Sequence, residues 1–432
     1  MKMKHERSIK QAKFAVLGII LLYVVFASAW AFTERLKYGP DEPAHFIYVR
    51  SIGSHFRIPV LSHEETPHAE AWDFEKTARR QPLSASHEAH QPPLYYAIAA
   101  VPYVIASSLN ADTDTTWRVV RLANVLIGAI WVYFLYRLLR ELFGERRFAA
   151  AAGAGFVGLL PMSAYIGGVV NNDALVCALF TAAMWLVIKA FRQDRLDVGS
   201  TIIIGIFCGL TALAKSQGFL LFPVVLLAAF FISRRSNYEN LARALLWALG
   251  TLGAASLVVS PWLIRNVIAV GALIPQSLHK PAPLVPIWFL TDQLFKYFWT
   301  PFWLIRDVVN EWGYLELTAL FCAVVFLGLI LHFVNCRKQK SKELLCRAEV
   351  WVLMAAPAVL IYVFLLRHTL LVDVGALQQG RLMLPSAGFV GMSVVLGFDS
   401  LTARNTMLKI TAAAATGAAL IAANIMIMRA VP

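Results

Sequence analysis

Two adjacent carboxylates, Asp41 and Glu42, are the residues best suited to acid–base chemistry in this chain. They stand in "YGPDEPAHFIY", between Pro40 and Pro43 and close to His45, just after a long apolar run. A carboxylate next to a hydroxyl group can take its proton as the oxygen attacks, and a second acid alongside strengthens it as a base. The alternative is structural, because proline and acidic residues also favour the first turn of a helix.

Three positively charged residues at the ends of apolar runs could bind an anionic substrate. Lys215 interrupts "GLTALAKSQGFLLF", Arg265 lies in "PWLIRN" and Arg381 in "QGRLMLP". A charge is costly in a bilayer, so Lys215 indicates a functional site unless its ammonium group reaches the interface. The guanidinium fork matches phosphate oxygens, which favours Arg381 as a ligand. Either arginine could instead anchor a helix end.

A further acid and a divalent metal ion are open alternatives. Asp173 in "NNDAL" begins an apolar run, where Asn172 or Asp173 could cap a helix or Asp173 could face Asp41. Asp41 and His45 are spaced i and i+4, so on a helix they share a face. With Asp173 or His90 they could hold a divalent ion, although no regularly spaced third ligand accompanies them.

The segment "HEAHQPPLYY", residues 87–96, adds polar side chains to the same region. One hypothesis is that Glu88, His90 and Gln91 face the same outer cavity as Asp41. The other is that the double proline is a stiff linker and Tyr95 anchors a surface helix at the membrane interface.

The elements that must position these residues are membrane helices. Of 432 residues, 59% are hydrophobic and 15% are charged, which is too little polar surface for a soluble protein of this size. Runs of about 18 or more apolar residues recur, each long enough to cross about 30 Å of hydrocarbon. We therefore expect an all-α polytopic membrane protein.

The formal net charge of +13 is explained by basic residues at the cytoplasmic ends of the helices, near anionic lipids. Nucleic-acid binding is not predicted, because no aromatic–basic platform or zinc spacing accompanies the charge. Three cysteines lie in apolar runs, and Cys336 and Cys346 lie in a basic loop. No disulfide framework is therefore expected.

Eleven apolar windows predict the membrane spans, and a twelfth segment is ambiguous. The windows are 14–32, 119–138, 148–169, 174–190, 199–214, 217–233, 243–263, 314–334, 350–367, 382–398 and 407–428. Segment 93–109 either crosses the membrane or lies on its outer surface. The surface placement is favoured, because it leaves the basic clusters in the cytoplasm with the N terminus.

The chain is expected to form a single transmembrane catalytic domain over residues 1–432. Its outer loops are predicted at 33–118, 264–313 and 368–381. The first is too rich in apolar and aromatic residues to be disordered, so it should carry juxtamembrane helices. The first apolar run is interpreted as a retained anchor rather than a cleaved signal peptide.

Six motifs, "GPDEPAHFIY", "HQPPLYY", "NNDAL", "LAKSQGF", "PWLIRN" and "QGRLMLP", follow one another over nearly the whole chain. This set resembles the C-type superfamily of polytopic glycosyltransferases, which use sugars linked to a polyprenyl phosphate. It looks closest to a poorly characterised bacterial branch with "DEPAHF", "PPLYY" and "QGR". The resemblance implies the C-type fold, with Asp41 as catalytic base and Glu42 beside it. The family's "HPPLxY" element, which lines the cavity near the donor phosphate, reads "HQPPLYY" here, with Gln91 inserted after His90.

The expected activity is a hexosyl- or pentosyltransferase that moves a sugar from a polyprenyl phosphate to a glycan, lipid or protein. The resemblance puts the site at the periplasmic face of a bacterial inner membrane, among membrane lipids. Attack opposite the leaving phosphate would invert the anomeric centre. Some relatives use a metal ion and others do not. Substrate contacts are assigned to His90, Tyr95, Asp173, Lys215, Arg265 and Arg381.

Two other classes of protein compete with this interpretation. A transporter or flippase of lipid-linked sugars should carry polar residues at mid-membrane and internal repeats, and no repeat is visible. A membrane scaffold would give no reason for clustered charges. A donor activated as a phosphate ester needs no ATP, and the chain has no Walker loop and no GxGxxG motif.

Overall fold

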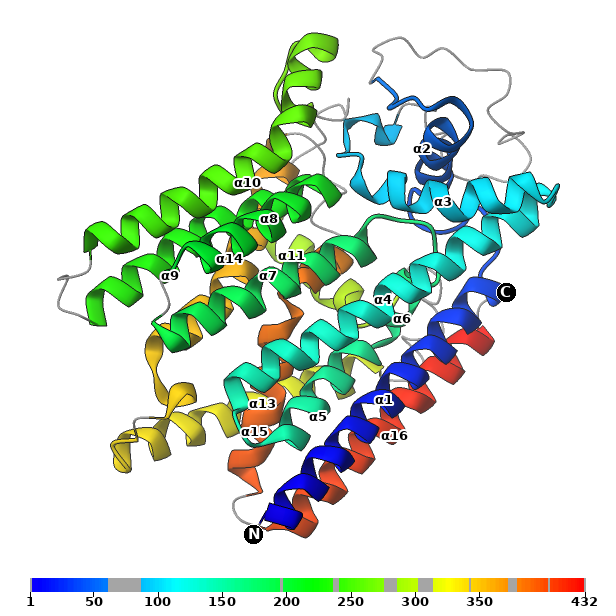
Figure 1. The fold of residues 1–432 in the computed structure, drawn as a ribbon. Helices are drawn as coiled ribbons and strands as arrows, with labels where there is room; N and C mark the ends of the chain where they lie inside the picture. Colours follow the sequence, from blue (N-terminus) through cyan, green and yellow to red (C-terminus); the bar gives the residue numbers. More distant parts are fainter. Residues whose placement is uncertain are drawn as a thin grey trace.

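The computed structural model describes residues 2–60, 87–194, 197–235, 241–275, 286–301, 314–341, 343–371, 379–402 and 405–430. Every regular element in these ranges is a helix (Figure 1). The predicted all-α class is therefore confirmed. Parts of all three predicted outer loops, at 61–86, 276–285, 302–313 and 372–378, lie outside the described residues.

Nine helices within the described ranges are long and apolar enough to cross a membrane. They are α1 (Lys2–Thr33), α4 (Thr113–Phe143), α7 (Asp173–Gln193), η3 with α9 (Ser216–Leu220 and Leu221–Arg235), α10 (Leu241–Val270), α13 (Tyr314–Lys338), α14 (Ala348–Leu371), η6 with α15 (Gly380–Ser386 and Ala387–Leu401) and α16 (Thr406–Ala430). The pair α5 (Arg147–Gly158) and α6 (Pro161–Gly167), bent by 68°, forms a tenth candidate. The apolar helix α8 (Val198–Ala214) has 17 residues. Each of the eleven predicted windows thus falls on one of these helices. Of the described helices, however, nine, or ten with the bent pair, qualify as spans, because α8 is too short.

The ambiguous segment forms α3 (Leu94–Ser108), a helix of 15 residues. Its length is about 23 Å, less than the ~30 Å of hydrocarbon in a bilayer. It packs against α2 (Glu42–His55) and α4. In Figure 1, α2 and α3 lie together beyond the C-terminal end of α1. This arrangement favours the predicted surface placement.

The basic ends of several helices gather at the end of the bundle opposite α2 and α3 (Figure 1). There Arg192 of α7 pairs with Glu141 of α4 at 2.8 Å, and Arg235 of α9 pairs with Asp194 at 2.8 Å. The N terminus of α1 also lies at this end. By the positive-inside rule this end would face the cytoplasm, and the topology stays a prediction.

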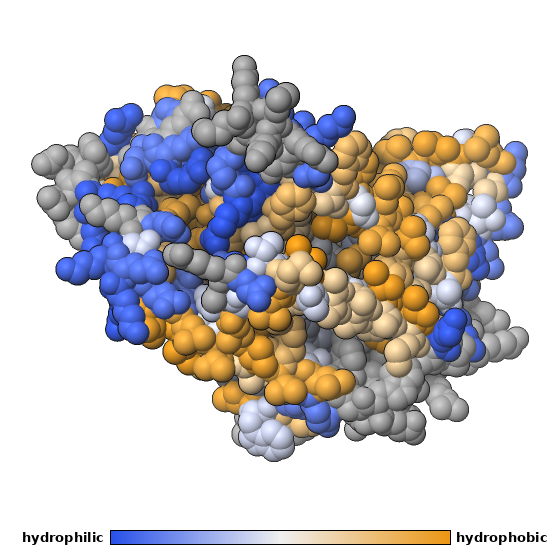
Figure 2. Space-filling view, turned by 90° about the horizontal axis from the view of Figure 1, so that it is seen from below, coloured by the Kyte–Doolittle hydropathy of each residue, from blue (hydrophilic) through white to orange (hydrophobic). Residues whose placement is uncertain are grey.

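Large apolar side chains are exposed along α1, α10, α13 and α16, for example Leu21, Leu257, Phe326 and Ile410. Figure 2 shows broad apolar areas on the face seen from below, with most hydrophilic residues gathered at one side. A water-exposed surface of this kind would drive aggregation, whereas lipid chains match it. The exposed apolar helices therefore support a multi-pass membrane protein.

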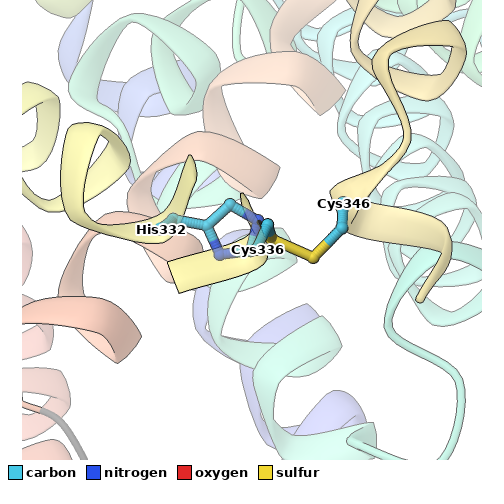
Figure 3. Close-up of side chains that lie close together, drawn as sticks. All are labelled: His332, Cys336 and Cys346. Atoms are coloured by element: carbon cyan, nitrogen blue, oxygen red, sulfur yellow. Dashed lines mark hydrogen bonds between the residues drawn. A yellow bond between two sulfur atoms is a disulfide. The ribbon is translucent and has the colours of Figure 1, made fainter. Parts of the chain in front are cut away.

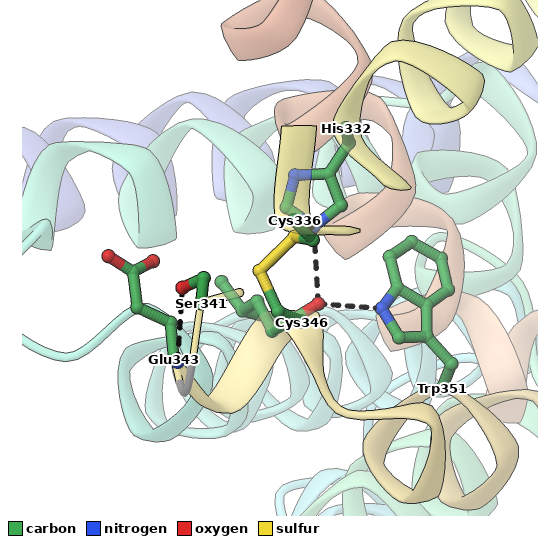
Figure 4. The surroundings of a disulfide bond; sticks show 7 residues. His332, Cys336, Ser341, Glu343, Cys346 and Trp351 are labelled. Atoms are coloured by element: carbon green, nitrogen blue, oxygen red, sulfur yellow. Dashed lines mark hydrogen bonds between the residues drawn. A yellow bond between two sulfur atoms is a disulfide. The ribbon is translucent and has the colours of Figure 1, made fainter. Parts of the chain in front are cut away.

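Cys336 and Cys346 form a disulfide between the end of α13 and η4 (Leu344–Cys346), as Figures 3 and 4 show. The expectation of no disulfide is wrong at this place. The turn after α13 brings the two Cα atoms to 5.6 Å, within the range that a disulfide requires. Sequence spacing in a basic loop does not reveal such a turn.

Candidate active site

Asp41 precedes α2 without capping it. Its backbone has φ 57° and ψ 11°, in the left-handed region, and its side chain makes no capping hydrogen bond. This conformation costs about 1–3 kcal/mol for residues other than glycine and is found mainly where the surroundings impose it. The carboxylate accepts a hydrogen bond from Arg381 Nη2 at 3.0 Å, and 29% of the side chain is exposed. The geometry favours a functional role for Asp41 over capping.

Arg381 bridges two carboxylates. Nη2 donates to Asp41, and Nη1 donates to Asp173 Oδ2 at 2.8 Å. Nη2 also donates to Gln379 Oε1 at 2.7 Å, and the side chain is only 4% exposed. The guanidinium is therefore held in one orientation by two carboxylates and an amide, and its role as a phosphate ligand stays a prediction.

Lys215 contacts the same Asp173 carboxylate through its Nζ atom. It lies in extended conformation, with φ −159° and ψ 141°, at the break between α8 and η3. The capping role considered for Asn172 or Asp173 belongs instead to Asn171, whose Oδ1 accepts a hydrogen bond from Asp173 N at 2.8 Å. Asp173 is buried and free to pair with both cations. The structure thus brings four of the predicted site residues into one ion-paired cluster: Asp41, Asp173, Lys215 and Arg381.

Gly380 lets α11 (Ile287–Trp299) pack directly on the segment that carries Arg381. A Cβ atom on Gly380 would lie 2.2 Å from both Leu294 O and Phe298 N. Any side chain must therefore push η6 away from α11. The glycine of "QGR" is required by this close approach.

We expect Gly380→Ala to lower the melting temperature, because overpacking typically costs about 1–3 kcal/mol. The measurement is thermal unfolding in detergent. Gly253→Ala is the matched control, since a Cβ atom there meets no heavy atom within 4 Å. Equal behaviour of the two variants would contradict the packing argument.

Three buried polar side chains that contact one another in series lie close to the ion-paired cluster. His45 Nδ1 lies 2.9 Å from Tyr96 OH, which in turn lies 3.5 Å from Glu88 Oε2. Burial lowers the pKa of His45, opposed by the charges of Glu88 and Asp41, so the imidazole is neutral at pH 7. The Tyr48 ring stacks on Tyr96 at 3.7 Å. The segment 87–96 therefore lies against α2, close to the acidic pair.

A divalent ion beside Asp41 does not fit the residues present. Asp41 is engaged by Arg381, and His45 by Tyr96. Within the described ranges, three metal-ligating side chains with ligand atoms within 4.8 Å of one another occur in one group: His332, Cys336 and Cys346. Two of these ligands are sulfur atoms joined in the disulfide (Figure 3). The metal alternative proposed for Asp41 and His45 is not supported by this geometry.

His90 and Tyr95 differ in their surroundings. His90 Nε2 lies 3.0 Å from Gln91 Nε2, and Gln91 Oε1 accepts a hydrogen bond from Asn172 Nδ2 at 3.4 Å. The inserted glutamine thus contacts the start of α7 near Asp173. Tyr95 is fully buried in the apolar cluster under α2, which makes it a packing residue rather than the expected substrate contact.

Arg265 holds the first loop instead of joining the cluster. Its Nη2 donates to the backbone carbonyls of Ile58 and Pro59 at 3.0 and 2.7 Å. The helix α10 continues to Val270, so Arg265 does not end it as expected. Arg265 thus anchors the first outer loop to α10 rather than a helix end, and these contacts do not place it in the charged cluster.

Glu42 is directed away from the cluster that contains Asp41 and is fully buried. Oε1 accepts hydrogen bonds from Arg121 Nε at 2.8 Å and Val170 N at 2.9 Å, and Oε2 accepts from Arg121 Nη2 at 2.7 Å and Gly39 N at 3.3 Å. With these four donors on its oxygens, Glu42 is a structural carboxylate rather than the predicted second acid. Sequence analysis missed Arg121, although a charge inside the 119–138 window is a recognisable signal.

Glu34 is buried beside this pair, and burial together with repulsion from Glu42 raises its pKa from 4.5 to about 7, although Arg121 opposes the shift. Between these two values the native state keeps a proton that the unfolded chain has released. Stability should therefore fall as the pH rises from about 4.5 to about 7, by ~3 kcal/mol in total.

We expect Glu34→Gln to abolish this decline, because the amide does not titrate. The measurement is thermal unfolding of both proteins in detergent from pH 4.5 to pH 8. If the two melting curves shift in parallel with pH, the proton is not held by Glu34.

One pocket of about 150 Å³ lies at the other end of α7, where Lys189, Gln193 and Asp197 line it. It contains none of the predicted site residues. The charged cluster, with its partly exposed Asp41, is therefore the better candidate for chemistry.

Two solved structures share the architecture of this chain. One is ArnT from Cupriavidus metallidurans bound to undecaprenyl phosphate, with 16% identity and a TM-score of 0.52 over 94% of this chain and 63% of that chain. The other is the oligosaccharyltransferase of Archaeoglobus fulgidus in complex with Zn and sulfate, with 15% identity and a TM-score of 0.54 over 94% of this chain and 52% of that chain. The protein thus has the C-type glycosyltransferase fold, as predicted, and spans only about half to two thirds of the length of these two proteins.

A family model described as a predicted membrane protein, DUF2142, matches residues 59–390. The chain belongs to this family. A comparison with curated proteins finds no match.

Proposed function

We propose that this protein is a membrane glycosyltransferase that moves a sugar from a polyprenyl-phosphate donor to an acceptor. The observation that carries the proposal is the ion-paired cluster of Asp41, Arg381, Asp173 and Lys215 at one end of the bundle. The likeness to ArnT, solved with undecaprenyl phosphate, supports the donor class. Because the basic helix ends lie at the opposite end of the bundle, the reaction is assigned to the outer face of a bacterial inner membrane.

Donor binding would exchange partners within the cluster. Arg381 and Lys215 are neutralised by two carboxylates, and a phosphate group competes for both cations through charge-assisted hydrogen bonds. When Arg381 Nη2 turns to a phosphate oxygen, Asp41 loses a cation and becomes a stronger base. Donor binding thereby prepares the base for the acceptor.

The transfer step follows from these positions. The acceptor hydroxyl gives its proton to Asp41 while its oxygen forms a bond to the anomeric carbon. The bond between that carbon and the phosphate oxygen breaks, and its electron pair leaves with the lipid phosphate. Arg381 and Lys215 stabilise the charge that develops there. Attack opposite the leaving group inverts the anomeric centre.

The position of the charges argues against a transporter. Asp173 is the first residue of α7, Lys215 lies at a helix break, and Asp41 precedes α2, so the cluster sits at helix ends rather than at mid-membrane. A scaffold would not need a partly exposed carboxylate held in a strained conformation.

Incubation of purified protein in detergent with a radiolabelled polyprenyl-phosphate sugar and membrane glycolipids tests the proposal. We expect free polyprenyl phosphate and a labelled acceptor to form together. In a parallel assay with the protein reconstituted in sealed vesicles, movement of the label across the bilayer without cleavage of the sugar–phosphate bond would identify a flippase instead.

A further inference from the structure

We infer that Arg121 is a positioning residue. By way of Glu42, it fixes the position of the carboxylate of Asp41, the proposed base. The inference rests on the proposed function, but its physical basis is a buried network next to the ion-paired cluster. Arg121 lies in the first turns of α4 and is fully buried.

Every N–H group of the Arg121 guanidinium has an acceptor. Nε and Nη2 donate to the two Glu42 oxygens, Nη1 donates to Ala31 O at 3.1 Å and Glu34 O at 2.8 Å, and Nη2 also donates to Arg35 O at 3.0 Å. A guanidinium has five N–H donors, and all are used here. The bonds join α4 to the end of α1, to the following turn and to the first residue of α2.

Glu42 connects the ion pair with Arg121 to the chain segments on both sides of the ion-paired cluster. Through Val170 N it fixes the segment that leads into Asp173, and through Gly39 N it fixes the segment that leads into Asp41. Glu42 N also donates to Gly39 O at 3.1 Å. The two carboxylates that Arg381 bridges are therefore both attached to one buried ion pair.

The bonds between Gly39 and Glu42 close a tight turn with Asp41 at its third position. Pro40 at the second position and a positive φ at the third are typical of a type II turn, where glycine or asparagine is usual. Asp41 therefore depends on outside contacts to stay in this conformation. The buried ion pair supplies them and directs the Asp41 carboxylate to Arg381.

A double-mutant cycle on thermal stability tests this without any assay of activity. Asp41→Ala and Arg381→Gln, each of which removes the contact, are made singly and together, and their non-additivity in melting temperature reports the Asp41–Arg381 contact. We expect a non-additivity of about 2 °C or more in the otherwise unchanged protein. In a Glu42→Gln background it should fall to near zero.

The control background is Arg235→Gln, which breaks an ion pair with Asp194 at the opposite end of the bundle. It should lower the melting temperature and leave the non-additivity unchanged. If Glu42→Gln does not fold, the neutral pair Arg121→Gln with Glu42→Gln replaces it, because no unpaired charge is then buried. Unchanged non-additivity in the Glu42 or neutral-pair background would overturn the inference.

Kinetics separate this inference from the proposed function. Glu42→Gln should lower kcat by about 10²-fold with little change in KM, as expected when a base is misplaced by about 1 Å. In an Asp41→Asn background the same change should cause no further loss, since Glu42 acts through Asp41. If the protein shows no transferase activity but the non-additivity in melting temperature still depends on Glu42, the proposed function is refuted. The inference that the buried ion pair positions Asp41 then still stands.

Discussion

Replacing Asp41 by Asn should reduce the rate of sugar transfer by about 10²–10⁴-fold, the contribution of a general base. The amide keeps the shape of the side chain and can still accept the hydrogen bond from Arg381, so the fold should survive. It does not take up the acceptor proton. The value of kcat, measured with a polyprenyl-phosphate sugar, should therefore fall. Binding of undecaprenyl phosphate should remain.

Asp194→Asn is the matched control for this prediction. Asp194 also pairs with an arginine, at 2.8 Å, and lies at the end of the bundle away from the cluster. Its replacement should leave turnover unchanged. Full activity of a folded Asp41→Asn protein would remove Asp41 from the mechanism.

Replacing Arg381 by Lys should lower kcat/KM by about 10²–10³-fold, the usual effect of losing a donor that stabilises developing charge. Lysine keeps the positive charge, but its single ammonium group does not bridge Asp41, Asp173 and Gln379 as the fork of Arg381 does. Affinity for undecaprenyl phosphate, measured by titration in detergent, should fall as well.

Arg265→Lys distinguishes this effect from a general loss of positive charge. Arg265 contacts backbone carbonyls of residues 58 and 59, so its replacement should affect stability more than donor affinity. If Arg265→Lys weakened donor binding as strongly as Arg381→Lys, the anchoring role assigned to Arg265 would be wrong.

The close approach of the site residues could be anticipated only in part. Asp41 and Arg381 lie 340 residues apart in the chain, yet their side chains form an ion pair. Each was predicted from its local pattern, an acid between prolines and an arginine at the start of an apolar run. A charge within a membrane span is costly and indicates a function, whereas an arginine at a helix end could equally be an anchor. The residue that pairs with each charge could not be predicted from the neighbouring sequence.

Asp41 and Glu42 are adjacent in the sequence, but their side chains have different partners and different roles. Glu42 follows Asp41 directly and was expected to work beside it, but the chain reverses direction at the turn and directs the two carboxylates to different partners. Arg121, which decides the role of Glu42, lies 79 residues away. The roles expected for Tyr95 and Arg265 changed for the same reason, since burial and backbone contacts are set by packing.

The membrane class, the helical windows and the main charged residues could be predicted without any knowledge of the packing. These follow from hydropathy, which acts over about 20 consecutive residues, and from the free-energy cost of a charge in hydrocarbon. The pairing of Asp41 with Arg381, the burial of Glu42 against Arg121 and the disulfide between Cys336 and Cys346 became visible with the three-dimensional structure. Such pairings depend on how distant helices pack, and no local pattern carries that information.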